Sequence, residues 1–133
     1  MPATDMYGLP VSASSDAAVR ALDSVAEGYL RYRADTPQRL ARLIEVGGDM
    51  PMAHVLKGYL TMLAFKEPVV PVARAALADA ERTGSAATAR EKAHIAALRE
   101  WCDGNLDGML GTWERILEDH PHDVMAFRLH HFQ

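Results

Sequence analysis

Glu91 and His94 have the residue types and the spacing of a chemical site. They stand at i and i+3, so on a helix they share one face. Di-iron bundles use a glutamate and a histidine at this spacing, but they need two such pairs and further glutamates. With one pair here, three interpretations stay open. The favoured one is structural, with Glu91 holding the His94 ring or pairing with Arg128; the others are contact with a polar ligand and binding of a metal.

The run His120-Pro121-His122-Asp123 places two imidazoles and a carboxylate close together. Neutral imidazole is a common metal ligand, so a metal site is chemically reasonable. A helix junction explains the same residues more simply. His120 suits the C-terminus of a helix, where the helix dipole favours a cation. Asp123 suits the start of the next helix, as an N-cap or as an acid in its first turn.

The remaining histidines and the one cysteine are interpreted as structural. We expect His54 to be packed or hydrogen-bonded near the start of its helix. His130 and His131 are adjacent and point about 100° apart on a helix, so they cannot share a metal. Cys102 behaves as a small apolar residue unless a base activates it. Without a phosphate-binding glycine loop, a serine elbow or a Cys-x-x-Cys pair, the sequence predicts no catalytic residue, metal or cofactor.

Helices must position these side chains, because apolar residues recur at helical spacing from Ser15 onward. Ser15 is the expected N-cap of the first helix, and Asp49 that of a helix opening near Pro51. Residues 1–14 are predicted to be an irregular arm, since Gly8, Pro10 and several serines interrupt any periodicity. The domain is expected over residues 15–133, as hairpins at about 16–47, 51–83 and 87–120 and an incomplete unit from 122.

The hairpins recur with a period of about 35 residues, close to the tetratricopeptide period of about 34. The sequence therefore predicts an all-α fold, a tetratricopeptide-like right-handed stack of antiparallel helical hairpins with about seven helices. The chain ends inside a fourth unit, which leaves Phe127, Leu129 and Phe132 without a covering helix. We expect a fragment of a longer array, with self-association through this last helix as an alternative.

The third hairpin resembles a tetratricopeptide helix-turn-helix. It has Gly104 at the turn, Trp113 in mid-helix and Pro121 at the exit. It departs from that pattern at Met109 and Ile116, where the repeat prefers small residues. These departures imply helices that pack farther apart than in a regular repeat.

Over its whole length the chain resembles the amino-terminal third of the tetratricopeptide repeat protein 38 family. Four segments carry the likeness: residues 5–10 (DMYGLP), 53–60 (AHVLKGYL), 88–98 (TAREKAHIAAL), and the run from 113 to 130 that contains Pro121-His122-Asp123. The resemblance implies the repeat fold and a chain that continues into further units. It implies no reaction.

In such a repeat the first helix of each hairpin lines a concave groove. Alignment on the repeat places an apolar and aromatic set with a few polar groups in that groove, the character of a ligand site. Its members are Tyr59, Met62, Phe65, Glu91, His94, Leu98, Trp101 and Arg128. The leading hypothesis is a binding or scaffold module for a peptide, a protein helix or a small molecule. The alternative is part of an enzyme, whose histidine and carboxylate site, with Glu91, His94 and His54 or His130, is completed by residues beyond this chain.

The composition limits the partners and the compartment. The 133 residues carry a net charge of -4, which argues against nucleic acid as a partner. The longest apolar stretch, around Tyr59 to Phe65, is far shorter than the roughly 20 residues that cross a bilayer. Asp5 and the lack of an apolar run before Pro10 argue against a signal peptide. One cysteine suggests a reducing compartment, so we expect a cytoplasmic protein without a membrane partner.

Overall fold

The computed structural model describes residues 2–31, 33–63 and 70–131. These residues form seven helices and one two-stranded sheet, which confirms the predicted all-helical class. The helices are α1 (Asp16–Leu30), α2 (Thr36–Gly47), α3 (Pro51–Met62), α4 (Val70–Thr83), α5 (Ala89–Cys102), α6 (Leu106–Asp119) and α7 (Val124–His131). The strands are β1 (Pro2–Thr4) and β2 (Pro10–Ser12). Phe65 and Phe132 lie outside the described residues.

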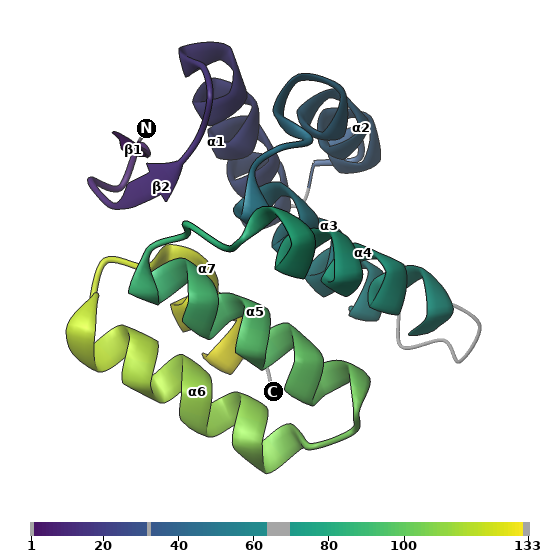
Figure 1. The fold of residues 1–133 in the computed structure, drawn as a ribbon, viewed down its shortest axis with the longest axis vertical. Coiled ribbons are helices and arrows are strands. Elements are labelled where there is room, and N and C mark those ends of the chain that lie inside the picture. The colour runs from purple at the N-terminus through teal and green to yellow at the C-terminus, as the bar shows by residue number, and fades with distance from the viewer. Residues whose placement is uncertain (1, 32, 64–69, 132–133) are drawn as a thin grey trace.

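Figure 1 shows three antiparallel helix pairs that follow one another in chain order: α1 with α2, α3 with α4, and α5 with α6. The helix α7 packs against α6, and the small sheet lies beside α1. The pairs are joined into one interior, because α3 contacts α5 and α4 contacts α5. Side chains of α3, α5 and α6 and of Asp123, which precedes α7, meet beside α5.

Local capping interactions define the starts of α1 and α5 but not that of α3. Ser15 caps α1 as predicted, since its side chain accepts the amide N–H of Ala18 at 3.1 Å. α5 begins with a capping box, in which Thr88 and Glu91 satisfy each other's amides. The prediction that Asp49 caps α3 is wrong. The N-cap is Met50, which makes no side-chain cap bond and instead buries its side chain fully in the core.

The prediction of an irregular arm over residues 1–14 is also wrong. β1 and β2 pair antiparallel, with Ala3 opposite Val11. The Asp5 carboxylate closes the connecting turn by accepting the amides of Tyr7 and Leu9, and Gly8 adopts a φ of 78° that other residues rarely adopt. Buried and exposed side chains alternate along β2, as expected for a strand with one face turned inward. Leu9 and Val11 are buried, and the residues between and beside them are more exposed.

Gly58 of α3 lies directly against the side chain of Leu98 on α5. A Cβ atom added to Gly58 would lie 2.4 Å from the Cδ2 atom of Leu98 on α5. An alanine would force the Leu98 side chain to shift, so the absence of a side chain at Gly58 lets α3 and α5 pack closely here. Around it lie the fully buried side chains of Tyr59 and Trp113, the largest in the core.

The last helix is less open than the sequence suggested. Leu129, expected to lack cover, is fully buried, because it and Ala126 face inward from α7. Phe127 is 58% exposed, and its ring stacks on that of His131 with centroids 6.0 Å apart. The uncovered surface of α7 is therefore limited to part of one face.

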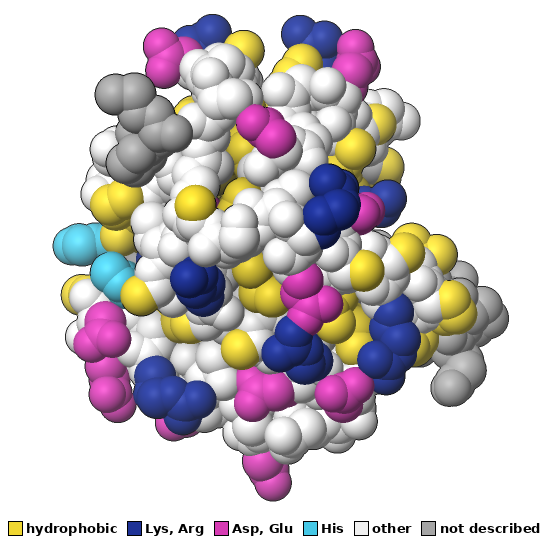
Figure 2. All heavy atoms as spheres, in the orientation of Figure 1, with side chains coloured by type: hydrophobic (Ala, Val, Ile, Leu, Met, Phe, Trp, Pro, Cys, Tyr) yellow, Lys and Arg dark blue, Asp and Glu magenta, His cyan; other side chains and the backbone are white. Residues whose placement is uncertain are grey.

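The surface shows charges of both signs. On the face drawn in Figure 2, basic and acidic side chains are interspersed. The large apolar side chains that are exposed, Met6, Val72, Leu106 and Phe127, belong to four different segments, which is ordinary for a protein surface. No helix among residues 2–31, 33–63 and 70–131 is long and apolar enough to cross a membrane.

Candidate functional site

Most side chains predicted to line an open groove are instead part of the interior. Tyr59, Glu91, His94, Leu98 and Trp101 are all buried, while Met62 and Arg128 are half-buried at the ends of α3 and α7. The reason is close packing between the first helices of adjacent pairs. The Trp101 and Trp113 rings meet edge to face with centroids 5.7 Å apart, and Leu98 fills the space above Gly58.

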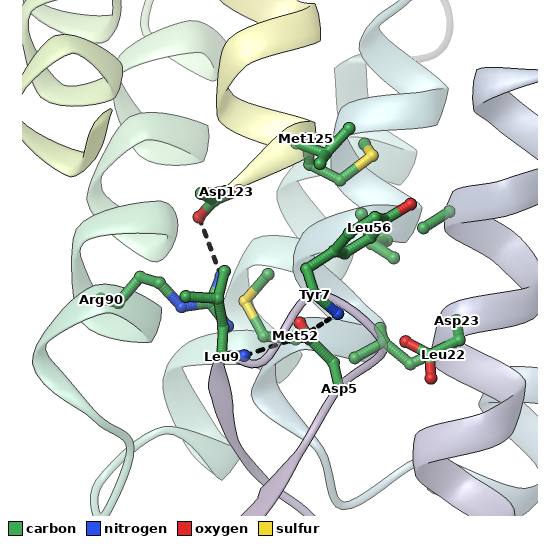
Figure 3. Close-up of a pocket in the computed structure, with 12 residues that line it drawn as sticks. Asp5, Tyr7, Leu9, Leu22, Asp23, Met52, Leu56, Arg90, Asp123 and Met125 are labelled. Atoms are coloured by element: carbon green, nitrogen blue, oxygen red, sulfur yellow. Dashed lines mark hydrogen bonds and ion pairs between the residues drawn. The ribbon is translucent and has the colours of Figure 1, made fainter. Parts of the chain in front are cut away.

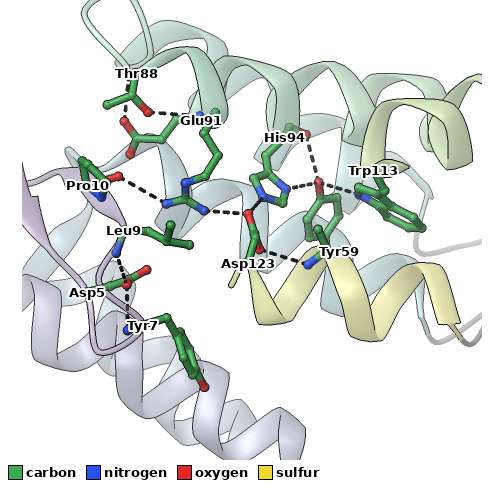
Figure 4. A network of polar contacts seen from close by, with 12 residues as sticks. Asp5, Tyr7, Leu9, Pro10, Tyr59, Thr88, Glu91, His94, Trp113 and Asp123 are labelled. Atoms are coloured by element: carbon green, nitrogen blue, oxygen red, sulfur yellow. Dashed lines mark hydrogen bonds and ion pairs between the residues drawn. The ribbon is translucent and has the colours of Figure 1, made fainter. Parts of the chain in front are cut away.

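A chain of buried hydrogen bonds runs through this interior (Figure 4). The indole N–H of Trp113 donates to the Tyr59 hydroxyl at 3.1 Å. That hydroxyl lies 2.8 Å from Nδ1 of His94. On the other side of the ring, Nε2 of His94 lies 2.7 Å from the Oδ2 atom of Asp123. Three helices and the residue that precedes α7 are thereby linked.

Asp123 and Arg90 extend the chain to the N-terminal arm. Oδ1 of Asp123 accepts the amide of Ala126, so of the two roles expected for this residue the structure shows the cap of the last helix. Oδ2 accepts from Nη1 of Arg90 at 2.8 Å, an ion pair that is almost wholly buried. Nη2 of Arg90 donates to the carbonyl oxygen of Pro10 at 3.3 Å. One arginine therefore holds both β2 and the start of α7.

Burial and neighbouring charges act in opposite directions on the pKa of Asp123. Burial favours the neutral carboxyl, but the charge and hydrogen bond of His94, together with the charge of Arg90, outweigh it. The pKa of Asp123 is held well below its usual range as a result. Tyr59 is the reverse case, since burial raises the pKa of its hydroxyl far above the ordinary value. Asp123 is therefore ionised and Tyr59 protonated at neutral pH.

The Tyr59 hydroxyl faces two acceptors on His94, the Nδ1 atom and the backbone carbonyl oxygen at 3.1 Å. Its single proton can serve only one at a time. When it donates to Nδ1, the imidazole is neutral and Nε2–H donates to Asp123. When it donates to the carbonyl, Nδ1 carries a proton of its own and the ring is charged. The network therefore satisfies both protonation states of His94.

The order carboxylate, histidine, hydroxyl is also that of a nucleophilic triad. Tyr59 does not meet the needs of a nucleophile. Its hydroxyl is fully buried, and burial raises its pKa, which opposes formation of the reactive anion; the hydrogen bond that it accepts from Trp113 acts the other way but is outweighed. The arrangement is suited to fixing helices relative to one another.

Glu91 does not hold the His94 ring, and the two residues have separate partners. Its Oε2 atom accepts the amide N–H of Ser12 at 2.9 Å, and its Oε1 atom accepts the Ser12 hydroxyl at 2.8 Å. Oε1 also accepts the amide of Thr88 at 2.9 Å as half of the capping box. Glu91 is fully buried, so the arm encloses this carboxylate.

A small hollow remains where the arm meets the helices (Figure 3). Its volume is about 30 Å³, space for roughly two water molecules. The arm, α1, α3 and the start of α7 line it, with Arg90 at one side; the lining side chains include Tyr7, Leu9, Asp23, Met52 and Leu56. The Nε atom of Arg90 is buried without a hydrogen-bond partner among the described residues. The arm thus fills most of the space that it covers.

The other candidates from the sequence have structural partners. His54 is buried, with Nε2 at 2.7 Å from the carbonyl oxygen of Gly48. Cys102 is buried, and burial raises the pKa of its thiol, which weakens it as a nucleophile. Within the part of the chain that the structure describes, no three His, Cys, Asp or Glu side chains gather closely enough to hold a metal ion.

Sequence reasoning missed Arg90, Ser12 and Trp113 as parts of the site. Arg90 carried a signal, because a positive charge in the first turn of a helix opposes the helix dipole and needs a specific partner. Ser12 carried none, since its partner Glu91 is 79 positions away. Asp123 was interpreted as a cap or a first-turn acid, but a cap uses one carboxylate oxygen and leaves the second unexplained.

No protein-family model matches this chain, and no solved structure matches it significantly. The class of protein therefore rests on the helical fold and on the contacts of the arm.

Proposed function

We propose that this chain is a tetratricopeptide-like helical-repeat binding module that holds an extended peptide segment, and that its own N-terminal arm takes that site in this structure. One observation carries the proposal. Glu91, a buried carboxylate on α5, is paired with both the backbone N–H and the hydroxyl of Ser12 in β2. A buried charge that is satisfied by an extended segment is a recognition feature, because without that segment Glu91 would keep only the Thr88 amide as a hydrogen-bond donor among the described residues.

The arrangement of helices supports this proposal. Three successive antiparallel pairs and a sequence period of about 35 residues fit stacked repeats, which create a continuous surface for extended ligands. Arg90 and Glu91, which form hydrogen bonds with β2, belong to α5, the first helix of its pair. That is the helix expected to line the groove of such a repeat. We also propose a cytoplasmic location, on the single cysteine and the ordinary charge balance.

The arm competes with any external ligand. A segment tethered in the same chain has an effective concentration on the order of millimolar. Binding of an external peptide is therefore best measured in the full chain with Ser12→Ala, which removes the hydroxyl that donates to Glu91 and loosens the arm.

Selection from a library of random extended peptides tests the proposal. The Ser12→Ala chain is expected to enrich peptides that bind, and an added Glu91→Gln substitution is expected to abolish their binding. Thr88→Ala is the matched control, because it removes the other half of the capping box, at a cost of about 1 kcal/mol, but leaves Glu91 in place. Failure to enrich any peptide from a folded chain would contradict the proposal, and so would equal binding by the Glu91→Gln chain.

A further inference from the structure

We infer that the site selects extended segments in which a serine or threonine directly follows a small apolar residue, and that the arm is its built-in competitor. This inference rests on the proposed function and adds the class of ligand. Three contacts between β2 and the helices define that class, one each at Ser12, Val11 and Pro10.

The contact at Ser12 demands two donors from one residue. Oε2 of Glu91 accepts the Ser12 amide and Oε1 accepts the hydroxyl, at 2.9 and 2.8 Å. An ionised carboxylate has no proton to donate, so its partner must supply both hydrogens. Serine and threonine do this at one position. Alanine leaves the Oε1 atom with the Thr88 amide alone, proline lacks the amide hydrogen, and aspartate adds a second negative charge.

The contact at Val11 demands a small apolar side chain. Val11 is fully buried, and β2 packs against α3. Valine is favoured in strands and fills this closed space. A charged residue at this position would be fully buried in the place of an apolar side chain, which carries a large desolvation cost.

The contact at Pro10 is independent of sequence but fixes direction. Nη2 of Arg90 donates to the Pro10 carbonyl, and every residue has such a carbonyl. Since Arg90 and Glu91 are adjacent on α5, the carbonyl and the serine must occur in this order along the segment. The site therefore recognises a carbonyl, an apolar side chain and a hydroxyl residue at three consecutive positions.

Fluorescence anisotropy with synthetic peptides of residues 2–14 tests this inference in the full chain with Ser12→Ala. Four labelled peptides are compared: the native sequence, and the same sequence with Ser12→Thr, Ser12→Ala or Val11→Asp. The native and threonine peptides are expected to bind alike, and the other two at least about tenfold more weakly, given the usual strength of a hydrogen bond to a charged group. The wild-type chain is expected to bind the native peptide about tenfold more weakly than the Ser12→Ala chain does, because its arm competes.

The other possible results overturn either the inference or the proposed function. Equal binding of the serine and alanine peptides would overturn the inference while leaving a peptide-binding module intact. Binding of none of the four, by a chain with a native circular dichroism spectrum, would overturn the inference; only failure of the random library as well would remove the proposed function. If Ser12→Ala unfolds the chain, the same ranking is measured on the wild-type chain at millimolar peptide by amide chemical shifts of Arg90 and Glu91.

Discussion

Asp123 has two tasks at the level of the single residue, one for each carboxylate oxygen. Oδ1 caps α7, and Oδ2 binds His94 and Arg90 in the interior. Both tasks need the ionised form, which is why the pKa of the carboxyl is lowered in spite of its burial.

The lowered pKa of Asp123 makes the free energy of unfolding depend on acid pH. The folded-state pKa lies below the unfolded value of about 3.9, so the stabilisation is complete well above pH 4. It is lost as pH falls below about 5 and on toward the folded-state pKa, because the unfolded chain binds the proton first. Urea unfolding at pH 7, 5 and 3.5 measures this loss.

Asp123→Asn is expected to cost about 3 kcal/mol or more at pH 7 and to flatten the acid dependence, since it leaves Arg90 buried without its counter-charge. Asp79→Asn is the control, because Asp79 pairs with Arg82 at the surface, where such pairs contribute about 0–1 kcal/mol. An equal loss in both variants would contradict the role given to Asp123.

Tyr59 contributes its hydroxyl as much as its ring. Tyr59→Phe keeps the ring contacts with Trp101 and Trp113 but leaves the indole N–H of Trp113 and the Nδ1 atom of His94 without their partner. We expect a loss of roughly 2 kcal/mol in the free energy of unfolding. Tyr7→Phe, in a half-buried residue of the arm whose hydroxyl makes no hydrogen bond within the described residues, should change it by less than about 0.5 kcal/mol. Similar small losses in both would show that the buried hydroxyl is dispensable.

At the level of elements, the contact between α3 and α5 depends on Gly58. Gly58→Ala places a methyl group against Leu98, and we expect this overpacking to destabilise the chain by about 1–3 kcal/mol. Gly111→Ala on α6 is a matched control of opposite sign. Its nearest neighbour is the flexible end of Arg115 at 3.6 Å, so the gain in helix propensity of up to about 1 kcal/mol should dominate. Thermal unfolding of both variants measures the two changes in stability. Stabilisation by Gly58→Ala would contradict the close packing of α3 and α5.

Arg90 couples the arm to α7, since one guanidinium binds both the Pro10 carbonyl and Asp123. Lysine has one donor group in place of the planar fork and cannot hold both partners in the same geometry. Arg90→Lys is therefore expected to speed amide hydrogen exchange at Ser12 and at Ala126 together. Arg82→Lys, at an exposed surface pair, should change neither amide. Faster exchange at only one of the two sites would show that the arm and α7 are held independently.

At the level of the whole molecule, the sequence predicted the helical class well because helices depend on local signals. Apolar residues at helical spacing and the caps at Ser15 and Asp123 lie close together in the chain, and the structure confirms both caps. Asp49 shows the limit of such signals, since burial of Met50 decides the start of α3 in its place.

The site could be predicted only in part, because its contacts join distant segments. Repeat alignment identified Glu91, His94 and Tyr59 as facing one region, and the structure does place them around a common interior. Repeat alignment could not show that residues 9–12 cover that region, since Ser12 and Glu91 are 79 positions apart. Glu91 and His94 resembled a pair in sequence, yet they bind different partners on α5.

The central claim is that the arm and an external segment share one site. Amide chemical shifts of the isotope-labelled Ser12→Ala chain, titrated with unlabelled native peptide of residues 2–14, test it most directly. We expect the amide signals of Leu9 and Val11 to move to positions typical of an unfolded chain as the peptide binds, while those of Arg90 and Glu91 stay in a bound environment. Peptide binding that leaves the arm amides unmoved would place the ligand elsewhere and contradict the claim.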